Sequence, residues 1–136
     1  MIFNGIASAG SLTPTISAAG GASGQTYAAQ AGIYVKIWRF VLAIGDVQLS
    51  AKGTLTGQLR LAGFPFTGDG TVSQAITFGY FSGLATAVTM LLAHVGAGTY
   101  ADMYMLTAAA TAPTAMTGAD IGSSARFMYV AAYLTN

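Results

Sequence analysis

Apolar and polar side chains alternate with a period of two along the middle of this chain, and this pattern constrains the fold most strongly. The alternation runs through residues 33–38 and 41–50, and after a Lys52-Gly53 turn it places Leu55, Leu59 and Leu61 on one face. Successive side chains of a β-strand point to opposite faces, so one face packs on a core. No segment has the spacing of an amphipathic helix. The sequence therefore predicts an all-β protein.

Further strands are predicted where short apolar runs lie between glycines and other turn residues. These runs are residues 15–17, 74–81, 86–93, 99–106 and 126–134. Together they predict an antiparallel β-sandwich or jelly roll of about eight strands. We expect residues 1–136 to form one domain, with residues 1–24 as an extended N-terminal arm or first strand. The alanine-rich residues 108–115 are predicted to be a loop, because Thr111 and Pro113 interrupt them.

Charged side chains are scarce, which limits the classes of protein that fit. Five Lys and Arg face four Asp, for a net charge of +1 on 136 residues. A monomer of this length exposes roughly 6,600 Å², whereas about a quarter to a third of the residues on soluble surfaces are charged. So few cations do not form a nucleic-acid site, and the apolar content argues against disorder. Without cysteine there is neither a disulfide nor a thiolate site.

Two explanations of the low charge remain, insertion into a membrane or a surface hidden in an assembly. The longest strongly apolar run, residues 84–95, has 12 residues, and a spanning helix needs about 20. The first ten residues, MIFNGIASAG, lack the cationic region of a signal peptide. We therefore expect no membrane insertion, and we expect the chain to associate with copies of itself or with a larger assembly.

The predicted strand 126–134 is apolar on both faces. Phe127, Tyr129 and Tyr133 share one face, and Met128, Val130, Ala132 and Leu134 share the other. A two-layer sandwich buries only one face of each strand internally. Either a neighbouring subunit covers the second face, or the segment 107–125 folds over it. The subunit is the favoured explanation.

No residue pattern nominates an enzyme, a metal site or a cofactor site. His94 is the one histidine and stands in an apolar strand, where a satisfied or interfacial role is expected. The aspartates fit structural roles: Asp69 and Asp120 in turns, Asp46 at a bulge after a glycine, and Asp102 as an acceptor for a tyrosine hydroxyl. Nucleophile, Walker and dinucleotide motifs are absent from the sequence.

The candidate functional residues are therefore those of an interface. Trp and Arg are enriched where proteins bind each other, so the Trp38-Arg39 pair is a candidate, although Trp38 fits a core position equally well. The predicted oligomer or partner interface comprises Trp38, Arg39, Tyr100, Tyr104, Phe127, Tyr129 and Tyr133. A glycan would use exposed aromatic side chains such as Trp38 or Tyr80.

The segment 34–67 reads YVKIWRFVLAIGDVQLSAKGTLTGQLRLAGFPFT. It resembles a domain found at the carboxyl ends of tailed-bacteriophage tail fibres and tailspikes. That domain has a Tyr-x-Lys-Ile opening, a hydrophobic strand with glycine, and then G-x-L-x-(I/L)-x-G-(L/F)-P-F. The matching positions are Tyr34, Lys36, Ile37, Gly57, Leu59, Leu61, Gly63, Pro65 and Phe66. The likeness covers nearly the whole chain, and it departs at Trp38, where the family often has glycine, and at Phe64, where leucine is common.

The resemblance implies a β-sandwich on the exterior of a virion that trimerises, has no enzymatic activity and transfers no catalytic residue. Because about ten residues precede the GSLTPT element, we expect a capsid decoration (cement) protein. The alternative within the virion is a tail fibre or tailspike tip that binds a host-surface glycan. Outside the virion, the remaining hypothesis is a small secreted lectin-like module. The expected partners are further copies in a homotrimer and other virion proteins such as major capsid or tail subunits.

Overall fold

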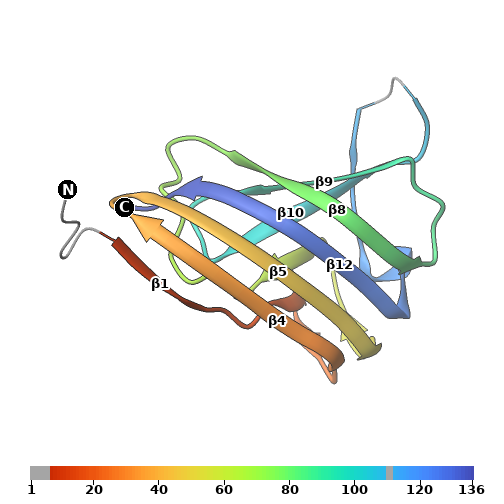
Figure 1. Cartoon of the computed structure of the whole chain (residues 1–136). Coiled ribbons are helices and arrows are strands. Elements are labelled where there is room, and N and C mark those ends of the chain that lie inside the picture. The colour runs from red at the N-terminus through yellow and green to blue at the C-terminus, as the bar shows by residue number, and fades with distance from the viewer. Residues whose placement is uncertain (1–6, 110–111) are drawn as a thin grey trace.

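The computed structural model describes residues 7–109 and 112–136, and nearly all of its regular structure is β-strand (Figure 1). A single turn of 3-10 helix, η1, spans Gly118–Asp120. The strands are β1 (Ala7–Ser11), β2 (Thr15–Ala18), β3 (Ala22–Ser23), β4 (Thr26–Ile37), β5 (Phe40–Ala51), β6 (Thr54–Leu55), β7 (Leu59–Ala62), β8 (Gln74–Leu84), β9 (Met90–Val95), β10 (Tyr100–Leu106), β11 (Thr114–Ala115) and β12 (Ile121–Leu134).

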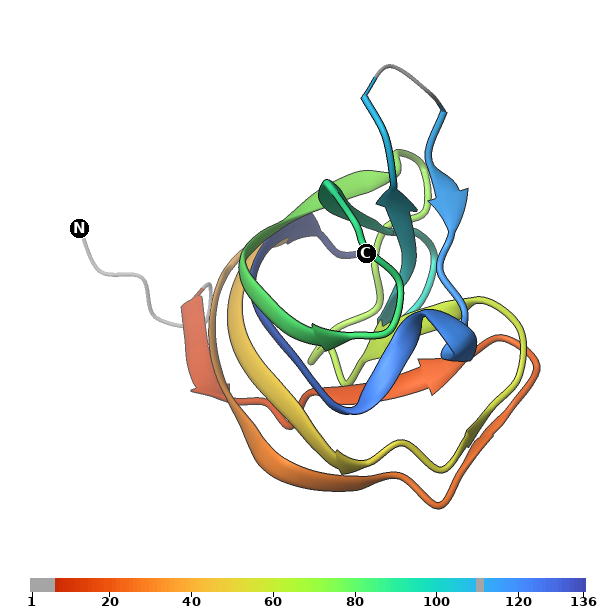
Figure 2. The ribbon, with the colours of Figure 1, turned by 90° about the vertical axis from the view of Figure 1, so that its right-hand side faces the viewer.

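One antiparallel sheet curls into two layers. Its order is β1-β4-β5-β12-β8-β9-β10-β7-β2, with β11 paired to β10, while β3 and β6 form a separate small sheet. The first five strands form the front layer of Figure 1, and β9 and β10 lie behind it. The end-on view of Figure 2 shows the sheet curving around a central interior.

The two edges of the curled sheet are joined by the short link between β1 and β2. The Leu12 amide donates a hydrogen bond to the Gly32 carbonyl at 3.0 Å. The Gln30 side-chain amide donates to the Pro14 carbonyl at 3.0 Å, and the Ile16 amide donates to the Tyr27 hydroxyl at 3.1 Å. These bonds hold β4 of the front layer against the start of β2 in the back layer. They connect the two layers at an edge where no pairing between the described strands joins them.

The core lies between the layers and follows the predicted alternation. In β5, every second residue from Val41 to Leu49 is buried, and in β7 both Leu59 and Leu61 are fully buried. The largest buried side chains come from β12: Phe127, Tyr129 and Tyr133. Aromatic side chains bury about 150–250 Å² each, so these three contribute heavily to the hydrophobic stabilisation.

Gly45 is required because the ring of Tyr129 lies directly against it. A Cβ atom at Gly45 would be 2.4 Å from Cζ of Tyr129. The predicted bulge at Asp46 is wrong, because Asp46 pairs in regular register with Ala31 of β4 and with Met128 of β12. The irregularity lies instead on the other side of β12, where its register with β8 shifts between Met128 and Tyr129. Gly45 therefore makes room for the Tyr129 ring, and it does not indicate a β-bulge at this point of β5.

The predicted all-β antiparallel sandwich is confirmed, but the strands are more numerous than eight. The additional strands β1, β3 and β11 have two to five residues and lack large apolar side chains, so they carry no alternation to detect. Strand β9 begins at Met90, four residues after the predicted start. Of the predicted arm 1–24, residues 1–6 lie outside the described residues, and the remainder contains β1, β2 and β3. Residues 110 and 111 of the predicted loop also lie outside them.

The segment 107–125 does not cover the outer face of β12, so that explanation of the second apolar face is wrong. Its described part packs beside β7 and β10: the Leu59 amide donates to the Met116 carbonyl at 2.7 Å, and the Met116 amide donates to the Met103 carbonyl at 3.0 Å. The Met116 side chain is fully buried in the core. Val130 and Leu134, on the outer face of β12, remain exposed.

The two buried tyrosines of β12 should respond in opposite ways to loss of the hydroxyl group. The Tyr133 hydroxyl donates to the Phe66 carbonyl at 3.0 Å, whereas the buried Tyr129 hydroxyl has no hydrogen-bond partner among the described residues. An unsatisfied buried polar group destabilises a fold. We expect Tyr129→Phe to raise the free energy of unfolding by about 1 kcal/mol and Tyr133→Phe to lower it by about 1 kcal/mol. Denaturant unfolding measures both, and a destabilised Tyr129→Phe protein would contradict the assignment.

Alkaline pH should unfold the protein through the same two side chains. Burial raises the pKa of Tyr133 to about 12 and also raises the pKa of Tyr129, from an ordinary value of 10.0. Because the unfolded state loses the phenol proton first, the stabilisation is complete below about pH 10 and declines as the pH rises toward the folded pKa values. Tyr129→Phe should flatten the fall in unfolding free energy between pH 9 and about 11.5. An unchanged slope would show that this phenol does not govern alkaline unfolding.

Candidate functional site

The outer side of the front layer is a continuous apolar surface. Cross-strand pairing aligns three rows on it: Ile33–Ile44–Val130, Val35–Leu42–Ala132 and Ile37–Phe40–Leu134. We call these nine residues the apolar face. Its large side chains are between 37% and 61% exposed. On the far side of β4, Ala7 and Ala9 of β1 pair with Ile37 and Val35 and extend the surface. Monomeric proteins rarely expose so continuous an apolar surface unless it binds something.

A shallow groove runs along one edge of the apolar face. It has a volume of about 390 Å³, and Ile33, Ile44 and Val130 form one wall. The other lining residues are Ala31, Asp46 and Met128, with the backbone of Gly32, Gly45, Gly79 and Tyr129. The residues between these walls turn inward, with Gly32 and Gly45 facing Leu12 and Tyr129, so backbone alone forms the floor of the groove. An apolar side chain of a partner would fit between these walls.

Each end of the apolar face is bordered by an Arg–Asp ion pair. Arg126 binds Asp46 through two hydrogen bonds, from Nε to Oδ1 at 2.9 Å and from Nη2 to Oδ2 at 2.6 Å. This hydrogen bonding lowers the pKa of Asp46 and raises that of Arg126, so both remain charged and neutralise each other. At the other end Arg39 pairs with Asp69, and Arg39 Nε donates to the Thr135 carbonyl at 2.9 Å. The borders of the apolar face are thus electrically neutral.

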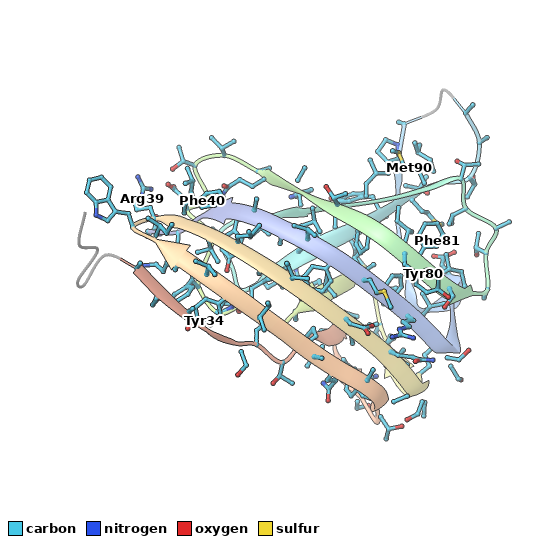
Figure 3. All side chains as sticks on the ribbon, in the orientation of Figure 1. Tyr34, Arg39, Phe40, Tyr80, Phe81 and Met90 are labelled. Atoms are coloured by element: carbon cyan, nitrogen blue, oxygen red, sulfur yellow. The ribbon has the colours of Figure 1, made fainter. Side chains whose placement is uncertain are left out.

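Trp38 and Arg39 form the two-residue turn between β4 and β5, and Figure 3 shows Arg39 and Phe40 together at this end of the molecule. Trp38 is 71% exposed, so it is not a core residue. Its φ of 55° lies in the left-handed region, which a residue other than glycine adopts at a cost. Glycine, which the sequence resemblance gives for this position, adopts this conformation without that cost.

The structure separates the aromatic residues that the sequence grouped as interface candidates. Phe127, Tyr129 and Tyr133 are core residues and contact their own chain, so they are not available to a partner. The opposite side of β12 is the exposed one. Tyr100 and Tyr104 lie on β10, in the other layer, and only Trp38 and Arg39 adjoin the apolar face. The alternation alone could not distinguish the two sides of β12, because both are apolar.

The outer side of the back layer carries a second surface, which we call the polar–aromatic face: Arg60, His94, Tyr100, Asp102 and Tyr104. The Arg60 guanidinium carbon lies 4.0 Å from the centre of the Tyr100 ring, and Nε donates to Asp102 Oδ1 at 3.0 Å. We expected Asp102 to accept a hydrogen bond from a tyrosine hydroxyl, but it accepts one from Arg60 instead. His94 stacks on Tyr104 with ring centres 5.4 Å apart. Sequence reasoning missed Arg60, although the alternation around Leu59 and Leu61 places it outward.

His94 is not satisfied in the way the sequence suggested. Its Nδ1 atom is buried and has no hydrogen-bond partner within the described part of the chain. Among residues 7–109 and 112–136 no charged side chain forms an ion pair with His94, and the His94 ring stacks on the Tyr104 ring. The His94 ring therefore contributes to the polar–aromatic face by stacking on Tyr104.

The other titratable groups have structural roles. Asp69 accepts bonds from Thr71, which lower the pKa of Asp69 and close the predicted turn. Although burial raises the pKa of Asp120, hydrogen bonds from Thr86 and Thr117 lower it, and the carboxylate closes the turn of η1. Within residues 7–109 and 112–136, no three His, Cys, Asp or Glu side chains gather to hold a metal ion. The described residues therefore present two distinct outer surfaces, the apolar face and the polar–aromatic face.

None of the helical structure in the described ranges is long and apolar enough to span a membrane.

Two substitutions of Trp38 separate backbone conformation from loss of the side chain. Both Trp38→Gly and Trp38→Ala remove the indole ring, but only glycine adopts a φ of 55° without strain. We expect the glycine variant to be more stable than the alanine variant by about 1 kcal/mol, which corresponds to roughly 3 °C in melting temperature. Thermal unfolding of both proteins measures the difference. Equal melting temperatures would show that the turn relaxes when alanine replaces tryptophan.

Comparison with known proteins gives one informative likeness. No family model matches the sequence, and no curated protein is similar to it. Among solved structures, the crystal structure of the Dettilon tailspike protein (gp208) superposes with a TM-score of 0.76 at 15% sequence identity. The match covers 96% of this chain and 24% of the tailspike chain, so this chain spans about a quarter of that protein. The tailspike resemblance predicted from the sequence is therefore confirmed for the fold: this chain has the fold of one part of a phage tailspike.

Proposed function

We propose that this chain is a non-enzymatic structural module on the exterior of a tailed-bacteriophage virion, of the tailspike or tail-fibre type. The observation that carries the proposal is the tailspike fold, which extends over 96% of the chain. The tailspike resemblance of the sequence motif supports it independently. The activities of the whole tailspike do not transfer, because this chain matches only 24% of it.

The positions of the motif residues fit a structural role. The Tyr34 and Phe66 rings meet edge to face with centres 5.3 Å apart, and Lys36 Nζ lies 5.1 Å from the centre of the Phe66 ring. The Tyr-x-Lys start of the motif and its Pro-Phe end thus contact each other between β4 and the segment after β7. An aromatic contact and a cation–π contact of this kind stabilise the fold. The motif holds two layers together and presents no reactive group.

A tail location is favoured over the capsid location expected from the sequence. The capsid decoration hypothesis rested on the small number of residues before the GSLTPT element, which says nothing about the surface of the folded chain. The shared fold is with a tail protein. We therefore place the module on the tail, and capsid decoration is the competing hypothesis.

Location in the intact particle tests the proposal. Antibodies raised against the purified chain should label the tail of negatively stained virions, and gold particles should be counted on tail and capsid separately. Labelling of the capsid surface would support the decoration protein instead. An absence of the chain from purified virions, measured by mass spectrometry of the particles, would overturn both virion hypotheses.

The polar–aromatic face favours binding of a host-surface glycan as a second function. Sugar hydroxyls bind Arg and Asp side chains, and the C–H faces of sugar rings pack on aromatic rings such as those of Tyr100 and Tyr104. The Arg60 and Asp102 side chains are each more than a quarter exposed, so both are available to a ligand. This surface replaces Trp38 and Tyr80 as the best candidate for glycan contact.

Substitution of one arginine tests the glycan function. Arg60→Gln should abolish retention of the purified chain on a glycan array, because it removes the charged donor beside Tyr100. Arg39→Gln is the matched control, since Arg39 also pairs with an aspartate but lies at the β4–β5 turn. Wild-type protein that is retained on no glycan would rule this function out, and equal retention of both variants would place the site elsewhere.

A further inference from the structure

We propose that the apolar face is the site at which a second copy of this chain docks, with the apolar side chains of one copy seated on the groove of the other. The inference deepens the proposed function by naming the partner of this surface. It rests on the size of the face, on its neutral borders, and on the presence of both ridges and a groove within it.

The size of the face suits a subunit contact. Together with its extension onto β1 and the groove beside it, the apolar face spans the four strands β1, β4, β5 and β12, and it covers residues 31–37 of β4. With strands about 4.8 Å apart and a rise of about 3.4 Å per residue, its footprint is roughly 20 Å by 20 Å, or about 400 Å². Side chains raise the accessible area above this footprint, toward the ~800 Å² that each partner buries in a stable interface.

The charges around the face favour a copy of this chain over a charged partner. The side chains of the apolar face carry no charge, and the Asp46–Arg126 and Arg39–Asp69 pairs at its ends are each neutral. Lys36 of β4 points to the other side of the strand, onto the Phe66 ring. The face therefore has no ring of free cations to attract an anionic membrane, and two copies approach without repulsion between like charges.

The shape of the face allows it to meet itself. Ile44 and Val130 stand beside a groove of about 390 Å³ whose floor is the backbone of glycines from β4, β5 and β8. A symmetric contact places the same surface on both subunits, so an exposed side chain of one copy, such as Ile44 or Leu42, enters the groove of the other. In the homotrimer expected from the resemblance, the contact is head-to-tail instead, with apolar side chains of each copy seated in the groove of the next.

A charge placed on the face should dissociate the assembly. We expect the wild-type chain to sediment as an oligomer at micromolar concentration and Ile44→Lys to sediment as a monomer with an unchanged circular dichroism spectrum. Met90→Lys is the control, because Met90 is about equally exposed but lies on β9, at the far end of the molecule from Phe40 (Figure 3). A monomeric wild-type chain, or an oligomer that survives Ile44→Lys, would overturn the inference.

A second measurement avoids any effect of lysine on folding. The chain has no cysteine, so Ile44→Cys and Met90→Cys each introduce a single thiol. In the oligomer, the thiol at position 44 should react with a maleimide reagent about tenfold or more slowly than the thiol at position 90, because the interface shields it. Equal rates would overturn the inference.

Flotation of the wild-type chain with phosphatidylcholine vesicles would identify a lipid surface as the occupant and would also overturn it. None of these measurements uses virions, so failure here leaves the virion location to be decided by the labelling experiment.

Discussion

The pairing of β5 with β12 determines the rest of the structure, because it assigns each apolar side chain either to the interior or to the surface. Paired residues share a face of the sheet, so Val41 and Tyr133 point inward while Phe40 and Leu134 point outward. Hydrophobicity alone does not fix this register, since a slip of one residue would exchange two apolar sets. A slip of β12 would, however, turn Arg126 toward the interior while Asp46 stayed on the outer side, which would leave a buried charge without its partner. It would also remove the glycine that accommodates Tyr129.

The two outer surfaces of the molecule differ in chemistry because the two layers differ in sequence pattern. The strands of the front layer carry aliphatic residues on their outer side, whereas β7 and β10 carry Arg60, Tyr100 and Asp102 there. In the proposed assembly, the aliphatic surface lies against another copy and the polar one faces solvent. The low overall charge follows directly, because only one of the two surfaces has to remain hydrated.

The sequence was sufficient to predict the fold class and the long strands, because a period of two in residues 41–50 leaves little choice of structure. It was not sufficient to predict β1 or β11, whose small side chains bury almost nothing. The exposed apolar surface was predicted only in part. The last strand was correctly identified as apolar on both sides, but its aromatic side chains form the core and its smaller aliphatic ones form the surface. That choice depends on the curvature of the sheet, which local sequence does not encode.

The place of β12 in the sheet has a consequence for the order of folding. This strand follows the other described strands in the sequence, yet it lies in the middle of the front layer, between β5 and β8. Contacts between such distant parts of a chain form slowly. Until residues 121–134 have left the ribosome, no strand lies between β5 and β8. The apolar face then lacks the residues that β12 contributes to it. A nascent chain that has not yet made β12 therefore lacks part of the surface that we propose for docking.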